Sequence, residues 1–93
     1  MLKIAQHTKF KSDSRKLIRS GTFSEKDEKT LFDIIQLLAQ GKDLDKKYRD
    51  HPLIGNWNKC RECHVKPDLL LIYQVDGDTL KLIRIGSHSQ LGL

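Results

Sequence analysis

The sequence predicts a single α+β domain, 1–93, in which a two-helix hairpin lies on one face of a mainly antiparallel, four-stranded sheet. Three observations support this prediction. Helical periodicity runs through 8–20 and again through 24–41. From residue 59 onward, apolar residues alternate with polar ones or form strand-sized runs. A short apolar stretch at 2–5 precedes the helices, so the expected order of elements is β-α-α-β-β-β.

The first two elements lie in a basic part of the chain. Leu2 to Ala5 can form an opening strand, and Thr8 is expected to cap a helix that runs to about Ser20. Gly21 then supplies a helix stop. One face of this helix is formed by residues spaced i, i+4, i+7 and i+8, namely Phe10, Ser14, Leu17 and Ile18.

The second helix has clear boundary signals. Ser24 is a typical N-cap, and the acidic Glu25 and Asp27 fall in the first turn, where the helix dipole favours negative charge. Gly41 is expected to end the helix. Its apolar face is formed by Leu31, Ile34, Ile35 and Leu38. Two helices joined by so short a turn form a hairpin whose apolar faces need a sheet to cover them.

The stretch 42–58 has neither a helical nor an alternating period. A structureless segment longer than about 12–15 residues is uncommon in so compact a domain and is usually functional or disordered. Its aromatic residues Tyr48 and Trp57, and its central HPLIG, argue against disorder. We therefore expect an ordered surface loop.

The C-terminal part of the chain predicts three strands. Residues 59–66, KCRECHVK, alternate, and residues 69–75, LLLIYQV, form a buried run. Residues 79–85, TLKLIRI, follow the turn Asp76-Gly77-Asp78, so the last two strands form a hairpin. The last strand leads into GSHSQLGL.

Charge and targeting signals restrict the partners and the compartment. The chain has 17 Lys and Arg against 12 Asp and Glu, a net charge of +5. Such a surface favours polyanions, with nucleic acid before membrane. The sequence shows no apolar segment of the ~7–15 residues of a secretory signal, and no run approaches the ~18 residues of a membrane span. We expect a cytoplasmic protein with no membrane partner.

Residues 60–64 read CRECH, which matches the attachment motif of a c-type haem and can also begin a zinc site or a redox dithiol. On a strand, however, Cys60 and Cys63 point to opposite faces, and the segment contains no turn residue. Haem attachment would also need an export signal and a downstream axial methionine, which the sequence does not provide. We therefore expect partly buried strand cysteines, with Cys60, Glu62 and His64 on one face, and no metal or cofactor.

Three of the four histidines are candidate functional residues: His51 in the long loop, His64 on a strand and His88 after the last strand. The predicted hairpin places His88 close to Asp68, and His64 lies just before Asp68. Metal-free RNA cleavage needs a base for the ribose 2′-OH, an acid for the departing 5′-oxygen and cations for the phosphorane. Histidine suits the first two roles because its unperturbed pKa is about 6.5.

Four further residues are candidate RNA-binding residues. Arg61 and Arg84 can hold a phosphate through their planar donor forks, and Tyr48 and Trp57 can stack on bases. Three of them also have a simpler alternative. The arginines also suit exposed strand positions, and Trp57, next to a Gly-Asn turn, also suits a packing role.

Three blocks, KYRDHPLIGNW, RECHVKPDLLLIY and RIGSHSQL, resemble in order and spacing the YafQ branch of the RelE-type toxins of bacterial type II toxin–antitoxin systems. The resemblance covers about 44–91 closely, and the β-α-α start fits the RelE-like fold in pattern. It implies an endoribonuclease of the mRNA interferase kind, which cuts translated mRNA on the ribosome without a metal ion and inhibits translation.

The resemblance also implies which residues are functional: His51, His64, Asp68 and His88. On this interpretation His88 is the general acid, and Asp68 or His51 is the base. His64 orients or stabilises the phosphate, and Arg84, directly before IGSH, is the expected phosphate clamp.

Two positions depart from the family pattern. Family members commonly carry an aromatic residue directly after the leucine of SHSxL and another at position 60, where this chain has Gly92 and Cys60. Neither change removes a titratable group. We therefore expect the chemistry to survive with altered selectivity.

The resemblance implies partners as well. A toxin needs an antitoxin, expected here to have a dimerising DNA-binding half of the ribbon-helix-helix type and an acidic half that wraps the toxin. The ribosome and mRNA are the other expected partners, and operator DNA would be reached only through the antitoxin complex. Two rival classes remain: a non-catalytic basic nucleic-acid-binding module, and a redox or metal protein built on Cys60, Cys63 and the histidines.

Overall fold

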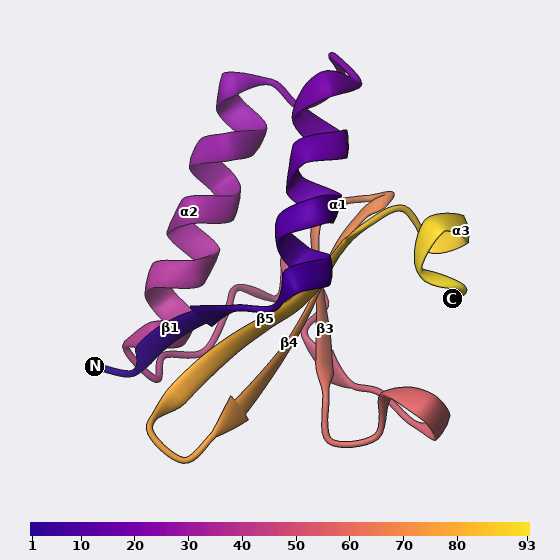
Figure 1. Ribbon diagram of the computed structural model, residues 1–93. Helices are drawn as coiled ribbons and strands as arrows, with labels where there is room; N and C mark the ends of the chain where they lie inside the picture. The colour runs from indigo at the N-terminus through magenta and orange to yellow at the C-terminus, as the bar shows by residue number, and fades with distance from the viewer.

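The computed structural model describes residues 1–93 and has the predicted α+β class (Figure 1). No helix is long and apolar enough to span a membrane. The elements in chain order are β1 (Lys3–Gln6), α1 (Thr8–Arg19), α2 (Glu25–Ala39), the 3-10 turn η1 (Lys46–Tyr48), β2 (His51–Pro52), the 3-10 turn η2 (Gly55–Trp57), β3 (Arg61–Lys66), β4 (Leu69–Asp76), β5 (Thr79–Gly86) and α3 (His88–Leu91).

The sheet has five strands in the order β1-β5-β4-β3-β2, one more than predicted. β1 runs parallel to β5, and the other neighbours are antiparallel. The additional strand is β2, which pairs His51 with Glu62 and Pro52 with Arg61. This strand lies within the segment 42–58, for which we expected a surface loop, because two residues are too few to show a strand period.

The helix boundaries are close to those predicted. Ser24 caps α2 and forms a capping box with Asp27, as its sequence signal indicated. The expectation that Thr8 caps α1 was wrong by one residue. His7 is the cap, and its ring Nδ1 accepts a hydrogen bond from the backbone N–H of Lys9 at 3.2 Å.

The sheet buries apolar side chains on both faces. α1 and α2 cover one face (Figure 1), where the main core consists of Phe10, Ile34, Leu38, Ala39, Cys63, Val65, Leu69, Leu71, Tyr73, Leu80, Leu82 and Ile85. On the other face Leu70 and Ile72 of β4 pack with Leu91 of α3 in a smaller cluster. The tail GSHSQLGL thus contains a short helix that the sequence did not reveal, because four residues carry too little periodicity.

An ion pair between Asp13 and Arg84 joins α1 to β5. The Arg84 guanidinium donates to both Asp13 carboxylate oxygens, at 2.6 and 3.1 Å, and the backbone N–H of Ile85 donates to Oδ2 at 3.1 Å. Both side chains are largely buried, with 10% of Asp13 and 21% of Arg84 exposed. Arg84 was expected to clamp a phosphate, but its donor fork is already engaged within the fold.

We predict that Asp13→Ala lowers the free energy of unfolding by about 1.5–3 kcal/mol, because it leaves a largely buried guanidinium without its acceptor. Asp33→Ala is the matched control, since it removes the carboxylate of an exposed i,i+4 pair with Lys29 and should cost less than about 0.5 kcal/mol. Urea unfolding followed by circular dichroism measures both. Equal losses in the two variants would contradict a structural role for the Asp13–Arg84 pair.

Candidate active site

Asp68 and His88 meet where the β3–β4 turn lies beside the end of β5. Leu70 pairs with Gly86 in the antiparallel β4–β5 ladder, so the residues just outside the ladder are neighbours. The backbone N–H of His88 donates to Asp68 Oδ1 at 3.0 Å, and the His88 ring Nδ1 lies 2.6 Å from the same oxygen. The predicted proximity of these two residues is confirmed.

The short helix α3 holds His88 in place. The Ser87 hydroxyl accepts a hydrogen bond from the backbone N–H of Gln90, and the Gln90 side chain accepts one from the backbone N–H of Ser87. A Cβ at position 86 would lie 2.8 Å from Gln90 Oε1, so Gly86 leaves room for this cap. Buried Leu91 anchors the other end of the helix in the smaller cluster.

Two hydrogen bonds from His88, from its backbone and then its ring, lower the pKa of the Asp68 carboxyl below its ordinary value. Asp68 is therefore ionised at neutral pH and is a weak base. A carboxylate can only accept, so the proton between the two groups is on His88 Nδ1. Asp68 thus orients the ring, and His88 Nε2 is left to exchange a proton with a substrate.

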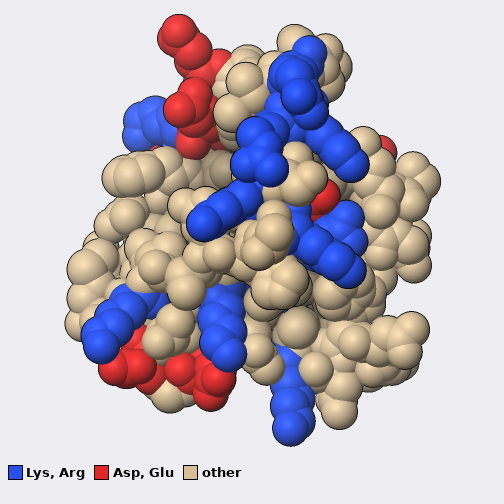
Figure 2. Space-filling view, viewed as in Figure 1, with Lys and Arg blue, Asp and Glu red and all other residues tan.

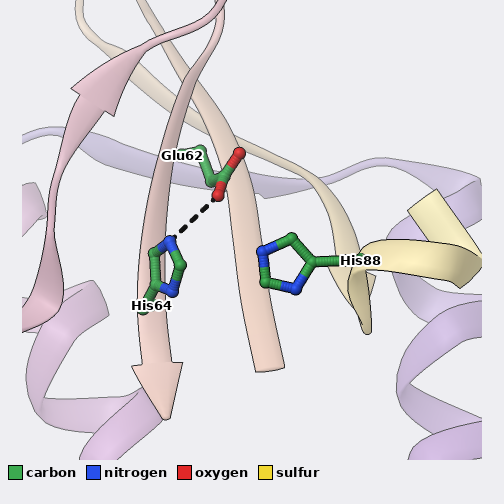
Figure 3. Close-up of side chains that lie close together, drawn as sticks. All are labelled: Glu62, His64 and His88. Atoms are coloured by element: carbon green, nitrogen blue, oxygen red, sulfur yellow. Dashed lines mark ion pairs between the residues drawn. The ribbon is translucent and has the colours of Figure 1, made fainter. Parts of the chain in front are cut away.

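Figure 3 shows Glu62, His64 and His88 pointing toward one another. Glu62 is 4% exposed, and its Oε1 lies 3.2 Å from His64 Nε2. The ring centroids of His64 and His88 are 5.6 Å apart. A register shift in the β3–β4 ladder, between His64 and Lys66, follows His64 directly. Such bulges commonly redirect side chains next to active sites.

His51 extends this group on the far side of His64. Its ring centroid lies 6.4 Å from that of His64, and its Nε2 lies 3.9 Å from Glu62 Oε2. The other ring nitrogen, Nδ1, is 2.7 Å from the carbonyl oxygen of Arg49. Because a carbonyl can only accept, Nδ1 carries the proton, and neutral His51 presents an unprotonated Nε2.

Asp50 attaches the segment that carries His51 to the sheet. Its Oδ1 accepts hydrogen bonds from the Tyr73 hydroxyl at 2.6 Å and from Arg61 Nε at 3.2 Å. Burial raises the pKa of Tyr73, so the hydroxyl keeps its proton for this bond. Arg61, a candidate RNA-binding residue, therefore uses its Nε–H to bind Asp50. Its side chain is still 43% exposed.

The two candidate aromatic residues have different positions. Tyr48 is half-buried in η1 against the main core, with Lys47 Nζ 5.1 Å from its ring centroid. Trp57 lies in η2, in the connection that enters β3 at Arg61, and packs against the smaller cluster. Trp57 thus lies toward the Arg61 end of β3, and His64 lies toward the other end.

The cysteines do not form a site. Cys63 is fully buried in the main core, and Cys60 packs against the smaller cluster on the opposite face, as predicted. Burial, and then the charges of Asp50 and Glu62, raise the pKa of the Cys63 thiol to about 12. Burial also raises that of Cys60. Protonated thiols on opposite faces support neither a dithiol nor a shared metal.

Glu62, His64 and His88 do form a possible ligand set for a metal ion. Each offers one ligand atom, and these atoms all lie within 4.8 Å of one another. Two imidazole nitrogens and a carboxylate oxygen are donors that transition metals accept. The expectation that no metal binds rested on the positions of Cys60 and Cys63, and it stays a prediction.

The outer surface of α1 is basic. Figure 2 shows Lys and Arg side chains gathered along α1 in the middle of the view. The exposed cations of that helix are Lys9, Lys11, Arg15, Lys16 and Arg19. The same α+β arrangement is found in YafQ from Escherichia coli strain BL21(DE3), whose crystal structure superposes with a TM-score of 0.86 at 28% identity, over 98% of each chain.

Residues 2–92 match the model of a protein family described as "Bacterial toxin of type II toxin-antitoxin system, YafQ". The chain belongs to the YafQ family of toxins.

Similar proteins agree with this assignment. The mRNA interferase toxin YafQ of Escherichia coli K12 is 46% identical over 44 residues, which span 47% of this chain and 48% of that protein. This chain thus aligns with about half the length of that curated relative. A metal-bound toxin from Helicobacter pylori superposes with a TM-score of 0.87 at 45% identity, over 98% of this chain and 99% of the other. YafQ in the E. coli DinJ–YafQ complex gives 0.84 at 30% identity, over 98% of each chain.

We predict that the Asp68 carboxyl titrates below its ordinary value of about 3.9. In His88→Ala the pKa should rise only partway, because the backbone N–H of residue 88 remains. Since the folded value is the lower one, the stabilisation is present above the unfolded pKa and is lost as the pH falls through the folded value. Carbon-detected NMR of the carboxyl measures it. A midpoint at or above 3.9 in the unmodified protein would refute the prediction.

Proposed function

We propose that this protein is the toxin of a toxin–antitoxin pair and cleaves translated mRNA on the ribosome by acid/base catalysis with its own side chains. The observation that carries the proposal is the row of His51, His64 and His88, ordered by Glu62 and Asp68. A curated relative is named an mRNA interferase toxin, and membership of the YafQ family supports the same activity.

His51 is the base in this mechanism. Its Nδ1–H is held by the Arg49 carbonyl, so Nε2 has a free lone pair that can take the proton of a ribose 2′-OH. The charge that then forms on the ring is stabilised by the Glu62 carboxylate 3.9 Å away. Asp68, the alternative base considered from the sequence, is too acidic for this role because its pKa is lowered.

His88 is the general acid. Asp68 accepts from Nδ1 and stabilises the protonated ring, while Nε2–H donates its proton to the departing 5′-oxygen. His88 is 45% exposed at its side chain, so a substrate can reach it. His51 thus removes the proton of the 2′-OH as the 2′-oxygen attacks phosphorus. His88 delivers a proton to the 5′-oxygen as the bond from phosphorus to that oxygen breaks.

His64 lies between the acid and the base and contacts the phosphate. Glu62 holds the His64 ring in place, because its carboxylate is buried and its Oε1 lies 3.2 Å from His64 Nε2. Glu62 is thus a positioning residue for His64. Arg84 is not needed as a phosphate clamp, because its contact with Asp13 makes it part of the fold. Arg61 keeps donors beyond its bond to Asp50, and its role in RNA binding stays a prediction.

The expected partners follow from the family and from the basic surface. An antitoxin of the ribbon-helix-helix type would present an acidic segment to this basic surface, since the whole chain has a net charge of +5. DinJ and YafQ associate as antitoxin and toxin in the solved E. coli complex. We propose that the protein acts in the cytoplasm, where ribosomes and mRNA are found. Operator DNA would be bound only through the antitoxin.

We also propose that Glu62, His64 and His88 can bind a transition-metal ion, since their donor atoms converge and a similar Helicobacter pylori toxin is metal-bound. Such an ion would supply a Lewis acid. An imidazole nitrogen cannot ligate a metal and carry a proton at once, so metal binding and proton transfer should exclude each other.

We predict that added Zn²⁺ inhibits cleavage, that a chelator restores it, and that His64→Ala weakens Zn²⁺ binding in calorimetry by roughly tenfold or more. The weaker binding has a simple reason, because the variant removes one of the three donors. Cleavage that disappears with the chelator and returns with Zn²⁺ would overturn the metal-independent mechanism.

The main proposal is tested by mapping new 5′ ends in a translated reporter mRNA after brief induction. We predict ends in phase with codons, which require translation and fall by roughly a hundredfold or more in His88→Ala, because that variant lacks the acid. His7→Asn is the matched control: it removes an imidazole far from the site and keeps a side chain able to cap α1.

Each other outcome has a definite meaning. Ends that persist when translation is blocked would contradict the role of the ribosome. No new ends from folded protein would contradict catalysis and favour the non-catalytic binding module. Equal loss in His7→Asn and His88→Ala would contradict a specific role for His88.

A further inference from the structure

Two polar hollows flank the histidine row. The first, of about 420 Å³, lies between the end of α1 and the β5–α3 connection, and is bordered by Lys16, Thr22, Asp68 and Ser87. The second, of about 450 Å³, lies between η1, α2 and β3. Each has a volume of the order that small-molecule sites have, roughly 300–1,000 Å³.

Both hollows share a wall with the proposed catalytic groups. Asp68, which holds His88, borders the first, and His64 borders the second. The rings of His64 and His88 are 5.6 Å apart. The first hollow therefore reaches the hydrogen-bond partner of His88, and the second reaches His64 itself.

Each hollow contains one lysine that is free to bind an anion. Lys16 borders the first and Lys47 the second, both are exposed, and neither forms an ion pair. Arg49 also borders the second hollow, is exposed and forms no ion pair, whereas the remaining two cations are paired. Arg84 in the first hollow is paired with Asp13, and Lys66 in the second with Asp27 at 2.8 Å. The charges of the paired cations are already neutralised within the fold, whereas the unpaired lysines are available to a ligand.

We propose that the two hollows are nucleotide subsites for the RNA strand on the two sides of the cleaved bond, with Lys16 binding a backbone phosphate on one side and Lys47 on the other. This inference rests on the proposed ribonuclease function and adds the path of the substrate. The strand crosses the row of histidines from the end of α1 to η1, which also places it beside Tyr48, the aromatic residue in the wall of the second hollow.

The test compares pairs of lysines that carry the same charge on the same element. Lys16→Ala is compared with Lys11→Ala on α1, and Lys47→Ala with Lys46→Ala in η1, since Lys11 and Lys46 are exposed and border neither hollow. The measured quantities are the toxin concentration for half-maximal cleavage of a translated reporter and the maximal rate. We expect roughly a tenfold higher half-maximal concentration for each subsite variant, as for one lost charged hydrogen bond. The maximal rate and both control variants should change less than twofold.

A second measurement locates the two contacts along the RNA. Synthetic mRNAs carry an uncharged methylphosphonate in place of the phosphate one position before or after the cleaved bond. In the unmodified toxin either replacement should weaken cleavage. In Lys16→Ala one replacement should have no further effect, and in Lys47→Ala the other should have none, because the lysine and its phosphate form one interaction.

The outcomes separate this inference from the function on which it rests. If the unmodified toxin produces no cleavage, the proposed function fails. If it cleaves, but Lys16→Ala and Lys47→Ala behave like their control variants, only the subsites are overturned. Methylphosphonate effects that add fully to both lysine variants would also overturn them.

Discussion

The antiparallel pairing of β4 with β5 is the constraint on which the rest of the structure depends. Residues 69–73 of β4 are buried, and they contribute side chains to the main core and to the smaller cluster on opposite faces. At the hairpin end the ladder closes at Asp76 and Thr79, and at the other end Leu70 pairs with Gly86. That last pair places the β3–β4 turn against the start of α3. Sheet register thus brings Asp68 and His88 together, and the capping box of α3 then holds His88 in place.

Sequence reasoning predicted the parts of the fold that have long periods or strong end signals. The capping box at Ser24 and the alternation through 59–85 identified α2 and three strands. It missed β2 and α3, which have two and four residues, because such short elements are formed by their tertiary contacts. It also could not locate the register shift between Ile72 and Tyr73, since a bulge leaves the local composition unchanged.

The site was predictable where it follows from strand geometry and not where it depends on distant pairing. Alternation placed Glu62 with His64, and the hairpin placed His88 with Asp68. The partner of Arg84 is 71 residues away in sequence, so only the structure shows that this arginine is a fold contact. The same holds for the pKa of Asp68. That pKa is lowered by hydrogen bonds from His88, which the fold brings to Asp68, and the direction supports the proposal that Asp68 orients a histidine instead of acting as the base.

The central claim is that the histidines use the ribose 2′-OH of the substrate as the nucleophile, with one histidine removing its proton and another protonating the 5′-oxygen. The chemistry of the RNA ends tests this most directly, by mass spectrometry of the fragments from a synthetic mRNA cleaved on the ribosome. The account predicts a 2′,3′-cyclic phosphate on the upstream fragment and a 5′-hydroxyl on the downstream one. A 5′-phosphate on the downstream fragment would contradict it, because that product arises when water attacks and the 3′-oxygen departs.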